Sequence, residues 1–278
     1  MGNWLAGVLH CQGLAETARG EWTAARATLL EGLRLARDIG QPVRAGHAAA
    51  LLAALDAGAG DEQGCLSWLA AYAKDDLSGD AWGYSVALPA VIELSRGRFD
   101  ASLARFRPFQ AGAQWRADTA FWYQPDLAEA AARGGDPGWA AETSAAYGAW
   151  AAAGGQPWAL AVAARCRALT ATAGQREPHF AEALRWHAKG AGRPLEAART
   201  QLTYGEWLRR EKRRSAAAVQ LLRAVETFDA LGAAAWAARA RTELAAAGQA
   251  AARAKAPGVL ARLTPQEYQI VALAAQGQ

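Results

Sequence analysis

Small residues face bulky apolar residues in successive amphipathic segments of this chain, and this pattern limits what it can fold into. Between residues 195 and 231, apolar residues fall at three- and four-residue steps along two stretches separated by a charged turn, which is typical of two α-helices that each bury one face. Gly205 and Ala217 carry almost no side chain, so two helix axes can approach closely there. Leu208 and Leu221 fill the space beside them. The segment therefore predicts a helical hairpin packed on its neighbours.

The same spacing recurs near the start of the chain and resembles the tetratricopeptide repeat, a two-helix unit. The matching positions there are Gly13, Gly20, Trp22, Ala25 and Leu29. A glycine-x-aromatic turn at 20–22 also returns at 97–99, a little over two repeat lengths later. We expect residues 1–248 to form an all-α, tetratricopeptide-like array of helical hairpins, an α-solenoid. Generic hairpins without repeat geometry are the alternative.

Composition supports helices along the whole array. The chain is rich in Ala, Leu and Arg and poor in Ile, Val and Thr, and Ala and Leu are the residues that a helix accommodates at least cost. Pro and Gly cluster between the periodic segments. Further helices are predicted at 43–57, 62–74, 81–95, 100–107, 113–123, 126–133, 137–153, 158–172, 180–189 and 235–247.

Several classes of protein are disfavoured. No run is long and apolar enough to span a bilayer, and no signal peptide opens the chain. Cys11, Cys65 and Cys166 are isolated in apolar helical contexts, which favours small core residues in a reducing compartment over a disulfide framework. We therefore expect a cytoplasmic protein. The net charge of +4 does not by itself decide on a nucleic-acid partner.

The composition changes after residue 248. Residues 249–262 combine small and basic residues with a central Pro-Gly pair and read as a basic linker. A capping box follows, because Thr264 can cap a helix that has Pro265 at its first position and Glu267 three residues after the cap. The apolar pattern then runs to Gly277, where a C-cap belongs.

This terminal stretch, residues 263–278, resembles the first helix of the LuxR-type helix-turn-helix domain. The matching residues are Leu263, Thr264, Pro265, Glu267, Ile270, Val271, Leu273, Ala274, Ala275 and Gly277. The helices before it also resemble the region that precedes this domain in large LuxR-family regulators related to the maltose regulator. That second resemblance depends on Ala198, Arg199, Thr200, Gly205, Glu206, Leu208, Arg209, Arg210, Leu222, Arg223, Ala224, Phe228, Leu231, Gly232, Ala233, Trp236, Ala237, Arg239, Ala240, Glu243 and Leu244.

The sequence departs from this family in two ways. The later helix that reads bases in the major groove and the dimerising helix after it do not occur in these residues. No residue can therefore be assigned a base contact, and Thr264 could contribute at most a phosphate contact from a helix N-terminus. The ATPase of the large members needs a phosphate-binding loop, and the motif G-x-x-x-x-G-K-[ST] is not present.

Two clusters allow both a functional and a structural interpretation. Trp115, Trp122 and Tyr123, with Phe121, form the densest aromatic cluster. They could line a ligand or partner groove, although core filling in an Ala-rich protein is the favoured interpretation. The basic run at 209–214 could contact nucleic acid, but it falls at a helix end, where solvated cations offset the helix dipole.

Catalytic and metal-binding patterns have little support. His10 with Cys11, and His179 with His187, have no third ligand nearby in the sequence, so we predict no metal site. No G-x-S-x-G element or comparable nucleophile motif occurs. The sequence therefore predicts a protein that is not an enzyme and holds no cofactor.

The leading hypothesis is a DNA-binding transcriptional regulator of the LuxR type. Promoter DNA would be bound through the complete helix-turn-helix domain, and the repeats would bind a small-molecule inducer, a partner protein or a second copy of the chain. A tetratricopeptide-like scaffold with no DNA role is the alternative. A small-molecule sensor without transcriptional output is a third possibility.

Overall fold

The computed structural model describes residues 4–75, 81–111, 122–190 and 192–248, and within these ranges every regular element is a helix. Trp115, Thr264, the linker and the capped terminal segment lie outside them. The elements are α1 (Leu5–Arg19), α2 (Trp22–Asp38), α3 (Pro42–Ala59), α4 (Glu62–Asp75), α5 (Ala81–Ser95), α6 (Phe99–Phe106), α7 (Pro108–Ala111), α9 (Gln124–Arg133), α10 (Pro137–Gly154), α11 (Pro157–Thr170), a 3₁₀ turn (Ala173–Gln175), α12 (Arg176–Lys189), α13 (Pro194–Arg210), α14 (Arg214–Leu231) and α15 (Ala234–Ala247).

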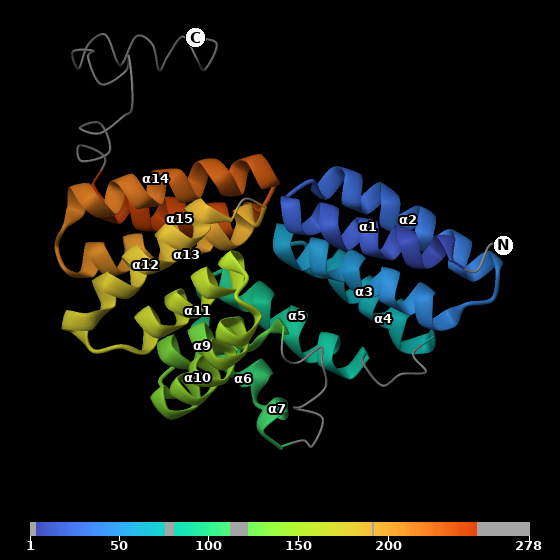
Figure 1. The fold of residues 1–278 in the computed structure, drawn as a ribbon, viewed down its shortest axis with the longest axis horizontal. Helices are drawn as coiled ribbons and strands as arrows, with labels where there is room; N and C mark the ends of the chain where they lie inside the picture. Colours follow the sequence, from blue (N-terminus) through green and yellow to red (C-terminus); the bar gives the residue numbers. More distant parts are fainter. Residues whose placement is uncertain (1–3, 76–80, 112–121, 191, 249–278) are drawn as a thin grey trace, which may run out of the picture.

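Consecutive helices pack as hairpins, as the sequence predicts for the described part of the chain (Figure 1). The predicted helices that fall within the described residues are present, with ends that differ by a few residues, and the helix predicted at 113–123 lies largely outside those residues. α9 begins at Gln124 rather than Asp126, because Pro125 is accommodated in the first turn. α12 begins at Arg176, four residues before the predicted start. A short helix that the sequence did not predict, α7, starts at Pro108, directly after the predicted helix at 100–107.

The predicted contact between small and bulky residues is present in two hairpins. A Cβ atom on Gly205 of α13 would lie 2.6 Å from Cγ of Leu221 on α14. A Cβ on Gly13 of α1 would lie 2.6 Å from Cδ2 of Leu29 on α2. Both distances are too short for any side chain larger than hydrogen. The glycines thus let each pair of helices pack closely enough to bury the leucines completely.

The hairpins form a closed ring, because the last described helix, α15, packs against α3 and α5. The turns after α1, α3 and α5 contain Gly20, Gly60 and Gly97, each with positive φ. A Cβ on Gly60 would lie 2.7 Å from the Cβ of Ala235 on α15, and one on Gly97 would lie 3.7 Å from Cδ of Arg239. α15 therefore runs across successive turns of the N-terminal hairpins.

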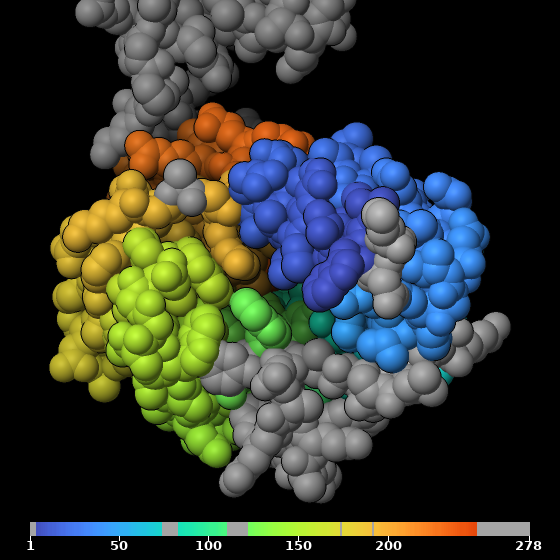
Figure 2. Space-filling model, turned by 45° about the vertical axis from the view of Figure 1, so that its right-hand side comes forward, coloured from blue at the N-terminus to red at the C-terminus, as the bar shows by residue number. Residues whose placement is uncertain are grey.

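Figure 2 shows a hollow between the blue N-terminal hairpins and the lime and yellow C-terminal ones, with the green start of α9 inside it. The largest buried apolar cluster spans α5 to α15, and smaller clusters lie within the N-terminal hairpins. Cys65 and Cys166 are buried as predicted, but Cys11 is exposed, because it lies on the same exposed face of α1 as Val8. Among the described residues, no helix has the length and hydropathy needed to cross a membrane.

Candidate functional site

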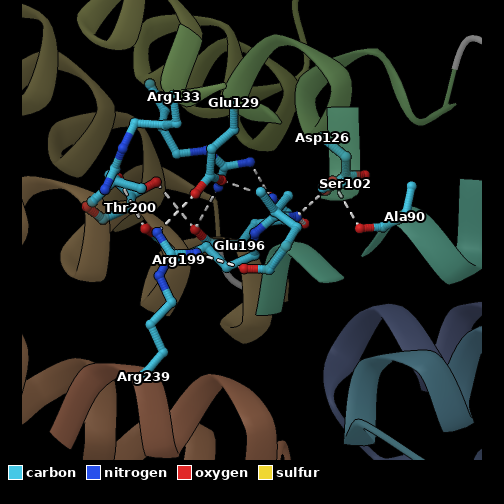
Figure 3. Close-up of polar contacts among 12 residues, drawn as sticks. Ala90, Ser102, Asp126, Glu129, Arg133, Glu196, Arg199, Thr200 and Arg239 are labelled. Atoms are coloured by element: carbon cyan, nitrogen blue, oxygen red, sulfur yellow. Dashed lines mark hydrogen bonds and ion pairs between the residues drawn. The ribbon is translucent and has the colours of Figure 1, made fainter. Parts of the chain in front are cut away.

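A buried network of charged side chains lies where α9, α11, α13 and α15 meet (Figure 3). We refer to it as the ion network. Its members are Asp126, Glu129 and Arg133 of α9, Arg165 of α11, Glu196, Arg199 and Glu206 of α13, and Arg239 of α15. Four carboxylates balance four arginines whose side chains are at most 13% exposed. The network joins four helices while remaining electrically neutral.

Arg199 connects α13 to α9. Its guanidinium lies 2.6 Å from Oδ1 of Asp126 and 3.1 Å from Oε2 of Glu129. It also approaches Oε1 of Glu196 at 3.4 Å and lies 4.6 Å from the ring centre of Trp236. A planar guanidinium can serve several acceptors at once and still stack on an aromatic face, so arginine suits this position better than lysine.

Arg239 connects α15 to three other helices. It donates to Oε1 of Glu206 on α13 at 2.8 Å and to Oε1 of Glu129 on α9 at 3.0 Å. It also donates to the main-chain carbonyl of Leu94 on α5 at 2.9 Å. The guanidinium lies 5.0 Å from the ring centre of Phe99. One side chain thus links the final helix to both the middle and the N-terminal part of the ring.

The remaining arginines complete the pairing of the acids. Arg133 donates to Oε2 of Glu206 at 2.6 Å, so Glu206 binds two arginines from different helices. Arg165, fully buried on α11, lies 2.7 Å from Oε2 of Glu196 and donates to its main-chain carbonyl at 3.1 Å. Buried charges are tolerated only when they are paired in this way.

The electrostatics of the acids follow from burial and from these partners. Burial alone would raise the pKa of Glu129, but the charges of Arg239 and Arg199 outweigh it and lower the pKa to about 2. The pKa of Glu196 is lowered to about 2 in the same way, with Arg165 and Arg199 outweighing burial. At Asp126 burial dominates over Arg199 and raises the pKa.

His187 lies beside the network, on α12. Its Nε2 is 3.0 Å from Oγ1 of Thr200. Burial, followed by the positive charge of Arg165, lowers the pKa of His187 to about 4. The imidazole is therefore neutral near pH 7. His179 is the other histidine of the pair considered for a metal site. Its Nδ1 atom lies 3.7 Å from Oε2 of Glu182.

A cavity of about 220 Å³ opens on the network from the middle of the ring, and we refer to it as the central cavity. Its walls come from both ends of the chain, including Trp22 of α2, Leu88 of α5 and Trp236 of α15. Asp126, Arg193, Glu196 and Arg199 supply its charged wall. A side cavity of about 60 Å³ adjoins it and shares these four residues.

Of the three aromatic groove candidates, two can be placed. Trp122 lines both cavities and is 51% exposed, and Tyr123 lines the central cavity. Burial raises the pKa of Tyr123 well above its ordinary value, so its hydroxyl is protonated. Tyr123 also packs against two buried apolar clusters, so its side chain contributes to the core as well as to the cavity wall. Trp115 lies outside the described residues, so its groove role stays a prediction.

Arg193, just before α13, is a charged residue of the cavity wall that stands outside the ion network. Its guanidinium carbon lies 3.9 Å from the ring centre of Trp158. Trp158 in turn stacks on Trp122, with ring centres 6.3 Å apart and planes 9° apart. Arg193 is half-buried, and no carboxylate of the described residues lies within 4.0 Å of it. Burial, opposed by the charge of Glu196, lowers its pKa.

The two buried thiols and the acids of the ion network are not activated as nucleophiles or bases. Burial raises the pKa of the Cys65 and Cys166 thiols to about 12, so neither is a reactive thiolate. Within the described ranges, no group of three or more His, Cys, Asp or Glu side chains is placed to hold a metal ion. Each acid of the ion network has an arginine partner, which leaves none poised as a general base.

The basic run at 209–214 is occupied by ion pairs at the surface. Arg209 pairs with Glu243 of α15 at 2.5 Å, and Arg213 pairs with Glu177 of α12 at 2.7 Å. Arg210 approaches Glu206 at 3.8 Å. These contacts favour the structural interpretation of the run over a nucleic-acid patch.

Sequence reasoning did not single out the ion network as a site. Arg199, Glu206 and Arg239 were noticed only as part of a family resemblance, and Asp126, Glu129, Arg165 and Arg193 were not singled out at all. One available signal is a charged residue flanked at helical spacing by residues of a buried face. Arg199 lies between Ala198 and Leu202, and Arg239 follows Trp236 by three residues.

Comparison with known proteins does not identify a family for this chain. No protein-family model, no curated protein and no solved structure matches this chain significantly.

Proposed function

We propose that this chain is the regulatory region of a LuxR-type transcriptional regulator, with residues 1–248 as a tetratricopeptide-like sensor array and residues 263–278 as the start of its helix-turn-helix domain. The motif at residues 263–277 suggests the DNA-binding class. The array would act in the cytoplasm and bind an inducer, a partner protein or a second copy of itself.

The observation that carries the proposal is the position of α15 (Ala234–Ala247). This helix closes the ring, contributes Arg239 to the ion network and is followed directly by the linker at 249–262. A change in the contacts between α15 and the other helices would therefore change the position of the residue at which the linker begins. A ligand that binds the closed and open ring with different affinity would shift the population of the two states and alter the freedom of the C-terminal module.

The alternative is a scaffold that holds a partner peptide in its groove and has no DNA role. The observation in its favour is an exposed apolar stripe at the N-terminal end of α1, formed by Trp4, just before the helix, and by Leu5 and Val8. Such a stripe is a surface on which another protein can pack. A scaffold of this kind needs neither the capping box at Thr264 nor a neutral, buried network behind α15.

Genome-wide mapping of DNA occupancy by the complete gene product tests the proposal. The regulator predicts enrichment at a small number of promoters, each with a shared sequence element. Residues 1–278 alone, among which no base contact can be assigned, are expected to give no sequence-selective shift with any of those promoters at physiological salt. Occupancy that is absent or uniform along the genome would favour the scaffold.

A further inference from the structure

The wall of the central cavity contains one cation without a carboxylate partner. Arg193 is half-buried and lines the cavity, and no carboxylate within the described residues pairs with it. The two acids of the same wall, Asp126 and Glu196, are already paired with Arg199 and Arg165. A ligand that supplies an anionic acceptor can therefore form a charge-assisted hydrogen bond with Arg193.

The charge of the wall defines the ligand further. The ion network is neutral, so Arg193 leaves one positive charge beside the cavity. A singly charged anion balances it. A phosphate dianion would bring excess negative charge toward Asp126 and Glu196, which share the same wall. A cation is disfavoured, since Arg193 already occupies the face of Trp158.

The apolar part of the wall is largely aromatic. Trp22, Trp122 and Trp236 line the cavity, and Leu55, Leu88 and Val91 cover the side toward the N-terminal hairpins. Indole rings pack well against flat ring systems. The volume of about 220 Å³ is below the range of sites that enclose drug-sized molecules, so it fits a metabolite with one or two rings.

We propose that the central cavity binds a small aromatic carboxylate, with the carboxylate on Arg193 and the ring against Trp122. Trp158 holds Arg193 in place by stacking beneath its guanidinium. Walls from α2, α3 and α5 meet walls from α13 and α15 in this cavity, so the ligand bridges the two ends of the ring. The inference rests on the proposed function only in naming this ligand as the inducer.

Isothermal titration calorimetry of the full chain with indole-3-acetate tests the proposal. Indole-3-acetamide is the neutral control with the same ring, and cyclohexylacetate is the control with the same charge but no aromatic face. We expect saturable binding of one indole-3-acetate per chain, and binding about tenfold or more weaker for the amide, the size of a lost charge-assisted hydrogen bond. Cyclohexylacetate should also bind more weakly.

Two variants locate the site. Arg193→Gln should weaken indole-3-acetate binding about tenfold or more, and it should keep the fold because Arg193 makes no ion pair among the described residues. Trp122→Leu, at a half-exposed position, should weaken binding by a smaller factor. The matched control is Arg210→Gln, since Arg210 lines a different cavity beside Phe180 and Trp207. It should leave the affinity unchanged.

The proposal is overturned by no saturable binding at millimolar concentration, by equal binding of acid and amide, or by a loss with Arg210→Gln in place of Arg193→Gln. The genome-wide occupancy experiment is independent of these results. Binding through Arg193 without promoter occupancy would leave the inference standing and remove the regulator. Promoter occupancy without binding through Arg193 would support the regulator and overturn the ligand inference.

Discussion

Arg239 donates to the main-chain carbonyl of Leu94, a residue that precedes it by 145 positions, at a distance of 2.9 Å. The same side chain binds Glu129 and Glu206. The guanidinium therefore ties the last helix before the linker to the N-terminal part of the ring as well as to its middle. Since α15 also packs across the turn at Gly60, closure of the ring combines one buried polar connection with close backbone packing.

The turn at Gly60 tests the packing part of this closure. Gly60→Ala should destabilise the protein, because alanine is strained at φ +87° and its Cβ would lie 2.7 Å from that of Ala235. Gly40→Ala is the control, with a similar φ of +68° and open space around it. Urea unfolding should show about 1–3 kcal/mol more loss for Gly60→Ala, the usual range for overpacking. Equal losses would mean that α15 does not press on this turn.

Gly205 tests the close approach inside a hairpin. Gly205→Ala should lower the free energy of unfolding by about 1–3 kcal/mol, because the new Cβ would lie 2.6 Å from Cγ of Leu221. Gly148→Ala, inside α10 with open space around it, should raise the stability by about 0.5–1 kcal/mol, since alanine is the better helix former. Thermal unfolding of the two variants should therefore shift in opposite directions. A stabilising Gly205→Ala would contradict the packing.

His187 makes stability depend on pH. Its pKa is about 4 in the folded protein, against an ordinary value of 6.5. As the pH falls from 6.5 to 4, the unfolded chain takes up a proton on this residue and the folded chain does not, so stability is lost across that window. The loss from this one group is about 3 kcal/mol.

The comparison of wild type with His187→Gln isolates this contribution, because glutamine can still reach the hydroxyl of Thr200. Urea unfolding at several pH values should give a smaller slope for the variant between pH 4 and 6.5. His10, whose pKa is also lowered by burial, contributes equally to both proteins. Parallel slopes would show that His187 titrates normally in the folded state.

The sequence predicted the helices well because their information is local. The small-against-bulky pair Gly205 and Leu221 follows from spacing within one hairpin, and the structure confirms the contact. The aromatic candidates Trp122 and Tyr123 were singled out by their density, and both line the cavity. What spacing could not predict was whether they fill a core or face an opening.

The ion network and the ring closure could not be predicted, because their partners are far apart in the chain. Arg239 and Glu129 are 110 residues apart, and Arg199 and Glu129 are 70 apart. No periodicity within a helix identifies which carboxylate an arginine meets on another helix. Arg193 is harder still to identify, since it lies between helices, and only its place over Trp158 makes it part of the wall.

The most direct test of the ion network that holds α15 is a double-mutant cycle on Arg239→Met and Glu129→Gln, measured by urea unfolding in an osmolyte that keeps destabilised variants folded. Each single change should cost about 3–5 kcal/mol, and the pair should show a coupling energy of about 1–3 kcal/mol. The exposed pair Arg241 and Asp229, 2.5 Å apart on α15 and α14, is the control and should couple by about 0–1 kcal/mol. Additive losses for Arg239 and Glu129 would contradict the account, because α15 would then not be coupled to α9 through the ion network.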